Sequence, residues 1–376
     1  MMWLFILLAA IVLFGLSCVY LVCKVQHFYI VKKMSGGIRL KSILISIAIC
    51  VIGIALLMIC LGSVNAVITV VYLILFWIVT SIIFRIGRRV IKRNMKCKVY
   101  VEGIVAIVVT CLYMIFAAYQ DYGVWQKDYT IHTDKEVGDI KAVLIADSHV
   151  GTTFDGDGFS KHLKEIEKKK PDVLLISGDF VDDDTSLEDM KKSCEALGKV
   201  HTKYGIYYVF GNHDKGYYGS EYRGYSSDDL VKELKKNKVN VLQDEAVLVD
   251  DRFYIIGRKD RSEELEKGGK RKSMAALTDK LDDTKYQIVL DHQPVDYDAQ
   301  KESGVDMVLS GHTHGGQMLL MKIFQQLTGI GENNQIYGIE KLKNTNFIVT
   351  SGISDWAIKY KTGCRSEYVL INIEGK

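Results

Sequence analysis

Long runs of apolar residues occupy the first third of the chain. Four of them, at roughly residues 2–23, 43–61, 66–84 and 99–118, are long enough to cross a bilayer as helices. Glu102 is the only charged residue inside these runs. The first run lacks a basic start and is too long for a cleaved signal peptide, so we expect it to remain as a helix. The pattern predicts a membrane domain of residues 1–118 with four transmembrane helices.

The charged residues between the runs predict how the chain crosses the membrane. Basic residues separate the first run from the second and the third from the fourth, whereas LGSVN between the second and third carries no charge. These basic residues are Lys24, Lys32, Lys33, Arg39 and Lys41, then Arg85, Arg88, Arg89, Lys92, Arg93, Lys96 and Lys98. Basic loops favour the cytoplasmic side. Four crossings then make a multi-pass protein of the cell membrane with its N-terminus and everything after residue 119 outside the cytoplasm, and loss of one crossing would reverse the side.

After residue 119 the pattern changes to short apolar runs separated by amphipathic segments. Eight runs rich in β-branched residues are apolar on both faces, as strands buried in a sheet are. They lie at 141–147, 172–179, 205–212, 253–257, 286–292, 306–312, 346–352 and 367–373. Helices are predicted between some of these strands. Ser186 and Ser226 are each followed three residues later by an aspartate, a pattern that predicts the start of a helix at each serine. Alternating strands and helices predict an α/β domain over 140–376, after a linker at 119–139.

The charge of the chain also divides near residue 119. Twelve Lys+Arg and one acidic residue come before it, which leaves 36 basic and 44 acidic residues after it. Nucleic-acid binding needs a basic surface that neutralises phosphates. The acidic soluble part therefore predicts no nucleic-acid partner.

Polar side chains follow five of the predicted strands at the point where each strand ends. They are Asp147 and His149, Asp179, Asn212, His292, and His312 with His314. Ligands bind at the carboxyl ends of strands in α/β sheets, so we expect these residues to converge. Their mixed oxygen and nitrogen donors suit Mn, Fe or Zn better than Ca or Mg. The set is too large for one tetrahedral site and suits two divalent ions about 3.5–4 Å apart that share a carboxylate.

Each of these motifs has an ordinary structural interpretation by itself. DSH can be a turn, a GD pair ends many strands, and Asn212 can cap a helix. Five such motifs in one order within one domain favour a metal centre over five unrelated turns.

The five motifs together resemble a known family. DSH (147–149), GDFVDD (178–183), GNHD (211–214), DHQP (291–294) and GHTHGGQ (311–317) are similar to the motifs of the calcineurin-like metallophosphoesterase superfamily. GGQ and the later TSGISDW and RSEY look like its membrane-associated bacterial branch. The resemblance covers about residues 140–373. It implies a two-sheet sandwich flanked by helices that hydrolyses phosphoesters at a di-metal centre.

The resemblance also implies a role for each motif residue. One metal would be held by Asp147, His149, Asp179 and His314; Asp179 would bridge to a second, held also by Asn212, His292 and His312. His213 would stabilise the phosphate or protonate the leaving oxygen, and Asp182 would orient it. A hydroxide bridging the two metals would attack phosphorus.

Two segments beside the motifs bear on the substrate. The tyrosine-rich stretch 215–225 could contact a phosphorylated substrate or could be an ordinary surface loop. The apolar stretch 318–324 directly follows GHTHGGQ. Core packing is the first interpretation of that stretch, and contact with an acyl chain or the membrane is the second.

The sequence as a whole predicts a membrane-anchored, metal-dependent phosphoesterase. Its substrate would be a phosphodiester, a pyrophosphate or a phosphomonoester, with lipid-linked and cell-envelope esters among the candidates. The alternative is a non-catalytic membrane receptor whose domain binds metal or a phosphate ligand. The bilayer is an expected partner, and the sequence leaves the oligomeric state open.

Overall fold

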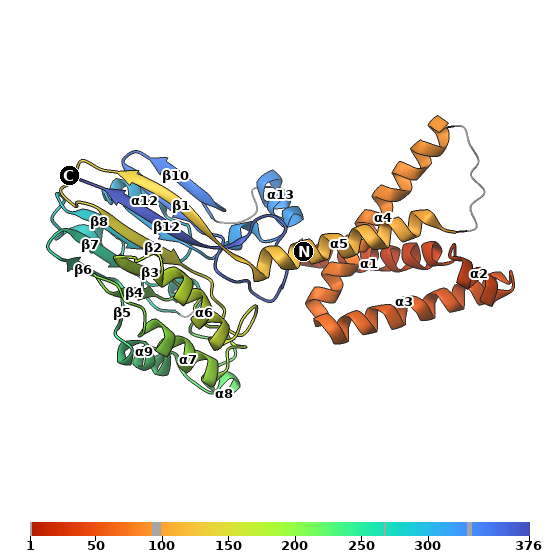
Figure 1. Ribbon diagram of the computed structural model, residues 1–376, viewed down its shortest axis with the longest axis horizontal. Coiled ribbons are helices and arrows are strands. Elements are labelled where there is room, and N and C mark those ends of the chain that lie inside the picture. The colour runs from red at the N-terminus through yellow and green to blue at the C-terminus, as the bar shows by residue number, and fades with distance from the viewer. Residues whose placement is uncertain (1, 92–98, 267, 329–332) are drawn as a thin grey trace. The chain divides into compact units, whose positions relative to one another are not determined.

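The chain divides into two compact units, Met1–Phe116 and Ala117–Lys376. The computed structural model describes residues 2–91, 99–266, 268–328 and 333–376, and Figure 1 labels its elements. Each unit is described by itself below.

The first unit is built from apolar helices. They are α1 (Met2–Val25), α2 (Tyr29–Ser35), α3 (Arg39–Leu61), α4 (Ser63–Ile91) and α5 (Val101–Tyr122), the last of which continues into the second unit. Among the described residues, α3, α4 and α5 are long and apolar enough to span a membrane, and Phe14–Val25 with α2, bent by 81°, makes a fourth candidate. The chain thus has three to four candidate spans.

The helices of this unit differ in one respect from the expectation. Helix α4 continues through Arg85, Arg88 and Arg89, which the apolar pattern had placed in a loop. The remaining basic residues of that loop, Lys92, Arg93, Lys96 and Lys98, lie outside the described residues.

The negative charge of Glu102, the acidic residue within the apolar runs, is balanced by side chains of the first unit. The Glu102 carboxylate lies 2.7 Å from Lys24 Nζ and 2.9 Å from Arg88 Nη2, and it accepts a hydrogen bond from Ser81 Oγ at 2.6 Å. A charge in an apolar helix is tolerated when such partners are present. These contacts account for a glutamate in the apolar helix α5.

The second unit contains two six-stranded sheets. The first has the strand order β1-β12-β2-β3-β4-β5 and the second β10-β11-β9-β8-β7-β6. The strands of the first are β1 (Val124–His132), β12 (Ser366–Glu374), β2 (Ile140–Ile145), β3 (Val173–Ser177), β4 (Ile206–Val209) and β5 (Val239–Val241). Those of the second are β10 (Gly338–Leu342), β11 (Thr345–Val349), β9 (Met307–Ser310), β8 (Tyr286–Leu290), β7 (Phe253–Gly257) and β6 (Glu245–Val249). Strands β2 to β5 run parallel, as do β7, β8, β9 and β11.

Helices cover the outer face of each sheet. The helices of this unit are α6 (Gly156–Glu167), α7 (Leu187–Leu197), α8 (Ser220–Arg223), α9 (Ser227–Lys236), α10 (Ser262–Leu265), α11 (Met274–Thr278), α12 (Tyr297–Glu302), α13 (Leu319–Thr328) and the 3-10 turn η1 (His314–Gly316). Side chains of α6, α7 and α9 share a buried cluster with the first sheet, and those of α11 and α12 share one with the second. The unit is therefore a sandwich of two sheets flanked by helices, as predicted.

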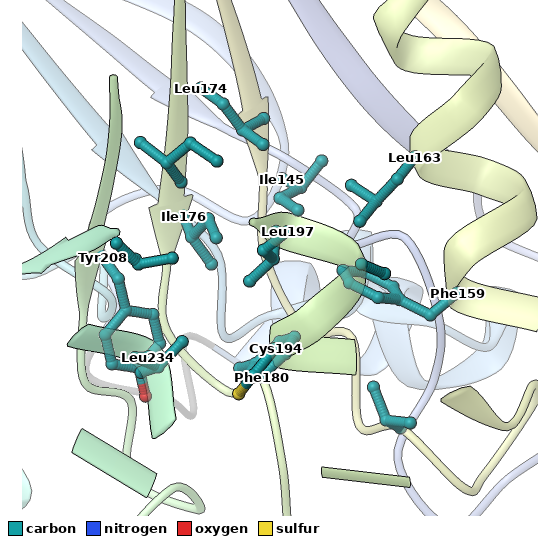
Figure 2. Close-up of a cluster of buried hydrophobic side chains, with 14 of the residues drawn as sticks. Ile145, Phe159, Leu163, Leu174, Ile176, Phe180, Cys194, Leu197, Tyr208 and Leu234 are labelled. Atoms are coloured by element: carbon teal, nitrogen blue, oxygen red, sulfur yellow. The ribbon is translucent and has the colours of Figure 1, made fainter. Parts of the chain in front are cut away.

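The alternation of side chains along the strands produces these layers. On β2, Val143 and Ile145 join the helical cluster, whereas Ala142 and Leu144 join the cluster between the two sheets. Figure 2 shows the helical cluster, where Phe159 and Leu163 of α6 and Cys194 and Leu197 of α7 lie over Ile145, Leu174 and Ile176. Strands buried on both faces must be apolar throughout, which is why they were recognisable in the sequence.

The predicted strands and helix starts are confirmed, with one correction. All eight apolar runs form strands, and Ser186 and Ser226 cap α7 and α9 with their side chains. The expected linker at 119–139 instead contains β1, which pairs along its length with β12. Its sequence VWQKDYTIH carries charges because β1 is an edge strand, and this hid the strand from a search for apolar runs.

Candidate metal centre

The carboxyl ends of five strands from both sheets bring the expected ligands together. Asp147 follows β2, Asp179 follows β3, and Asn212 follows β4; His292 follows β8, and His312 follows β9. The Ser177 hydroxyl donates to the Leu309 carbonyl at 3.0 Å and so joins the two sheets beside these ends. The site therefore draws on both layers of the sandwich.

Asp179 lies at the middle of the cluster. Its Oδ2 is 3.1 Å from His292 Nε2 and 3.6 Å from His149 Nε2. One carboxylate thus faces two imidazoles that come from different sheets. A carboxylate between two sets of donors is the arrangement that a bridging ligand requires.

The donors fall into two groups around Asp179. Asp147, His149 and His314 offer ligand atoms within 4.8 Å of one another, and so do Asp179, His292 and His312. Asn212 joins the second group, since its Oδ1 lies 3.2 Å from His292 Nε2 and 3.0 Å from His312 Nδ1. The structure therefore brings together all seven residues expected as ligands.

The donor set fits metal ions by its chemistry. His149 Nε2 is fully buried and has no hydrogen-bond partner among the described residues, a costly arrangement for a polar atom unless something binds there. His292 is fixed by its other ring nitrogen, Nδ1, which lies 2.8 Å from the Ser177 carbonyl oxygen. Such a contact fixes the ring so that Nε2 faces the other donors, Asp179 and Asn212.

The backbone at the site is strained so that the donors can converge. Five of the seven have positive φ: Asp147 (53°), His149 (35°), Asp179 (50°), His312 (71°) and His314 (47°). Left-handed backbone is uncommon outside glycine and concentrates at functional sites. A Cβ at Gly211 would lie 2.1 Å from Asp179 Oδ1, and one at Gly311 would lie 2.5 Å from Asp147 Oδ2. The glycines of these motifs are therefore required by close packing against the acids.

Electrostatics gives the groups different protonation tendencies. Burial opposes the charge of Asp179, but His292 and His149 outweigh it and hold the pKa of Asp179 well below its usual range. Burial lowers the pKa of His312 to about 4 and that of His314 to about 3. Metal ligands must be ionised carboxylates and neutral imidazoles. At neutral pH these three residues are already in that form. Burial opposes the charge of His149 and His292, but the nearby carboxylates outweigh it and raise the pKa of His149 to about 9 and that of His292 well above its usual range, so metal binding there would release protons.

Asp214 organises the loops that carry the ligands. Its buried carboxylate accepts hydrogen bonds from the backbone N–H groups of Asp179, Phe180, Val181 and Gly211, at 2.7–3.0 Å. It thereby joins the loop after β3 to the loop after β4. In the sequence, the only indication of a role for Asp214 is its place at the end of the GNHD motif. That place does not show whether the residue organises the loops or binds a metal.

The contacts of Asp182 correct one expectation. Asp182 was expected to orient His213, but its Oδ2 lies 3.2 Å from His149 Nδ1. The turn after β3 holds Asp182 there, because its backbone N–H donates to Thr185 Oγ1 at 2.9 Å. The His213 ring instead lies about 5 Å from the rings of His149, Tyr217 and Trp356. Asp182 therefore supports a donor of the cluster.

The tyrosine-rich stretch 215–225 and the segment after Ser351 also reach the site. Asn212 Nδ2 donates to the Tyr217 hydroxyl at 3.0 Å, so this tyrosine is part of the site. Arg223 is buried and donates to the carbonyls of Asp214 and Tyr225, so it is part of the structure of the loop. Asp355 Oδ1 lies 3.1 Å from His314 Nδ1; Asp355 belongs to the TSGISDW stretch, for which the sequence indicated no role at the site.

The fold and the site together define a class: an α/β sandwich protein with donors for two adjacent metal ions where its strands end. Residues 140–316 match the family model described as calcineurin-like phosphoesterase. An uncharacterised metallophosphoesterase of Aquifex aeolicus is 30% identical over 258 residues, which cover 66% of this chain and 91% of that protein. The chain belongs to the calcineurin-like phosphoesterase family.

In two further relatives, the region similar to this chain makes up only about two thirds or less of the protein. An uncharacterised metallophosphoesterase of Campylobacter jejuni is 29% identical, over 63% of this chain and 60% of that protein. A cattle (Bos taurus) protein described as a transmembrane protein with a metallophosphoesterase domain is 24% identical, over 77% of this chain and 66% of that protein. The chain thus spans about 60% of the first of these and 66% of the second.

Proposed function

We propose that this chain is a membrane-anchored phosphoester hydrolase with a di-metal centre. The observation that carries the proposal is the position of Asp179 Oδ2 between His149 Nε2 and His292 Nε2. The first metal position would comprise Asp147, His149, Asp179 and His314, and the second Asp179, Asn212, His292 and His312. Mn, Fe or Zn suits this nitrogen and oxygen set. The bound pair would supply Lewis acidity and a water of lowered pKa.

His213 is the residue that we assign to the leaving group. Its backbone N–H donates to Asp179 Oδ1 at 2.9 Å, which fixes the residue beside the bridging carboxylate. Its side chain is partly exposed, between Tyr217 and Trp356, so it can reach a substrate at the surface of the site. Burial lowers its pKa. A histidine in this position can stabilise the phosphoryl group or donate a proton to the leaving oxygen.

The test is hydrolysis of chromogenic esters by the full chain in detergent. After removal of metals with a chelator, bis(p-nitrophenyl) phosphate and p-nitrophenyl phosphate are each supplied with and without Mn²⁺. We expect Mn²⁺-dependent turnover, and the ratio of the two rates will assign the diester or monoester preference. Binding of Mn²⁺ without turnover of any phosphoester would favour a receptor domain instead.

The substrate that we favour is an ester carried by a lipid. Helix α13 begins two residues after the end of the GHTHGGQ motif, and four of its apolar side chains are each at least 42% exposed: Leu319, Leu320, Met321 and Ile323. Core packing, the first interpretation of this stretch, therefore does not hold for these four side chains. A contiguous exposed apolar surface of this kind marks a site of contact with a protein, a ligand or a membrane.

Hydrogen bonds place the start of α13 beside the end of an apolar helix. Leu319 N–H donates to Thr362 Oγ1 at 2.9 Å, and the neighbouring Lys361 N–H donates to the Ala117 carbonyl of α5 at 3.1 Å. Because α5 is a candidate span, a helix held near its end would meet the bilayer surface. This location supports access to an amphipathic phosphoester.

A matched pair of variants tests the lipid contact. Leu320→Gln should lower turnover of a phosphodiester carried in phospholipid vesicles while leaving turnover of the soluble chromogenic ester unchanged. Leu265→Gln, at an exposed leucine on α10, is the control and should change neither rate. Equal rates for Leu320→Gln and the unchanged protein on the vesicle substrate would contradict lipid access through α13.

A further inference from the structure

Three ionisable side chains are buried together behind the first metal position. Asp121, Asp355 and Lys361 have no exposed surface, and all three belong to the second unit. They come from distant parts of the sequence: Asp121 from the end of α5, and the other two from the segment between β11 and β12. We call Asp121, Asp355 and Lys361 the buried triad.

Lys361 holds the backbone that lies against Asp147. Its Nζ donates to the carbonyls of Ser351 at 2.7 Å and Ser354 at 2.9 Å, and lies 3.5 Å from Asp355 Oδ1. The Ser354 N–H in turn donates to the carbonyl of Asp147 at 3.2 Å. Lys361 thus shapes the loop that supports one expected ligand.

Asp355 faces a second expected ligand. Its Oδ1 lies 3.1 Å from His314 Nδ1, while His314 Nε2 is turned toward Asp147 Oδ1 at 3.9 Å. A carboxylate beside one ring nitrogen fixes the tautomer and orientation of a metal-ligating histidine. Both carboxylate oxygens of Asp355 are buried and lack a well-aligned hydrogen bond among the described residues, so the charge of Lys361, 3.5 Å from Oδ1, is what compensates the carboxylate.

The end of α5 completes the triad. Asp121 is close enough to Asp355 for the two carboxyl groups to interact, and the Thr153 hydroxyl lies 3.4 and 3.5 Å from the two carboxylate oxygens of Asp121. The Lys361 N–H donates to the carbonyl of Ala117 at 3.1 Å. Residues 117–122 therefore pack against the support of His314 as well as ending an apolar helix.

The cost of burial argues that the triad has a specific role. Replacing buried ion pairs by well-packed apolar residues is often neutral or stabilising, so charges of this kind are poor devices for stability. They can instead hold one defined geometry, and here the geometry that they hold is that of His314.

We propose that Asp355 is a positioning residue for His314, and that the end of α5 supports the first metal position through Asp121 and Lys361. The proposal rests on the proposed function, because it takes His314 as a ligand. It makes residues 117–122, the end of α5 that belongs to the second unit, a structural part of the metal centre.

The test measures Mn²⁺ binding by the full chain in detergent, with equilibrium dialysis of metal-stripped protein. We expect the unchanged protein to bind two ions. Asp355→Asn should weaken one of them about 10- to 100-fold, the usual effect of losing a ligand's support, and leave the other unchanged. Asp121→Asn should weaken the same ion by less. Asp306→Asn, at a carboxylate paired with Lys135 at 2.7 Å on the opposite end of β9, is the matched control and should change neither.

A double-mutant cycle assigns the affected ion. In the His314→Ala background, Asp355→Asn should cause no further loss, because the residue that it positions is gone. The isosteric substitutions should leave the melting temperature of the metal-free protein close to that of the unchanged protein. Wild-type affinity for both ions in Asp355→Asn and Asp121→Asn would overturn the inference and leave the proposed function intact. A wild-type chain that binds no pair of ions would overturn both.

Discussion

At the residue scale, the site is organised around the two oxygens of one carboxylate. Asp179 Oδ2 faces two imidazoles, and Asp179 Oδ1 accepts the backbone N–H of His213. The same side chain therefore takes part in the donor cluster and fixes the residue that we assign to the leaving group. Its positive φ of 50° is the backbone conformation that makes both contacts available.

His213 is expected to act in turnover without contributing to metal binding. Removal of a general acid typically costs about 10²- to 10⁴-fold in rate. We therefore expect His213→Ala to lower kcat for the chromogenic diester by a factor in that range. Equilibrium dialysis should show that Mn²⁺ affinity is unchanged. Loss of bound Mn²⁺ in this variant would make His213 a ligand and contradict the assignment.

The expected ligands could be found from sequence because each of them follows an apolar strand. The supporting residues could not be found in this way. Asp355 lies in an irregular segment, and Asp121 is on a helix whose pattern indicates only a membrane span. Their role depends on which segments meet in three dimensions. The same reason explains Asp182, whose partner is His149 and not the expected His213.

At the scale of elements, burial on both faces decides what the sequence can predict. The eight strands recognised from apolar runs lie inside the sheets or against a helix layer. Of the four strands outside this set, β1, β6 and β10 are edge strands with charged or exposed positions, and β5 is only three residues long. Edge strands carry such residues because half of their backbone groups face away from the sheet.

The capping box of α9 gives a prediction at this scale. The Ser226 hydroxyl accepts the Asp229 N–H at 3.2 Å, and the Asp229 carboxylate accepts the Ser226 N–H at 3.0 Å. Ser226→Ala should lower the free energy of unfolding by about 1 kcal/mol, the usual cost of losing an N-cap. Chemical denaturation measures this, with Ser227→Ala, one residue later, as the control. Equal losses in both variants would show that the cap contributes nothing specific.

At the scale of the whole molecule, metal binding should be linked to folding. Both proposed metal positions combine residues from strands of two sheets, so the unfolded chain cannot present them. A ligand at 100 times its Kd stabilises the folded state by about 2.7 kcal/mol per site. We expect Mn²⁺ to raise the melting temperature of the metal-stripped protein. An unchanged melting temperature at saturating Mn²⁺ would contradict a metal centre assembled by the fold.

The number of membrane spans determines the side on which the second unit lies. Three spans or four are consistent with the helices, and the basic residues between them favour a second unit outside the cytoplasm if there are four. We propose four. Alkaline phosphatase fused after Lys376 should then be active in bacterial cells, and a green fluorescent protein fusion should be dark. The reverse pair of results would indicate three spans.

The central claim is that Asp179 joins two metal ions that together hydrolyse a phosphoester. The most direct measurement follows diester turnover by the full chain while Mn²⁺ is added back to metal-stripped protein, with bound Mn²⁺ measured in the same samples. We predict that turnover follows occupancy of the second ion and reaches its plateau at two ions per chain, and that Asp179→Asn neither binds the pair nor turns over. Full turnover with one bound ion, or by Asp179→Asn, would contradict the account.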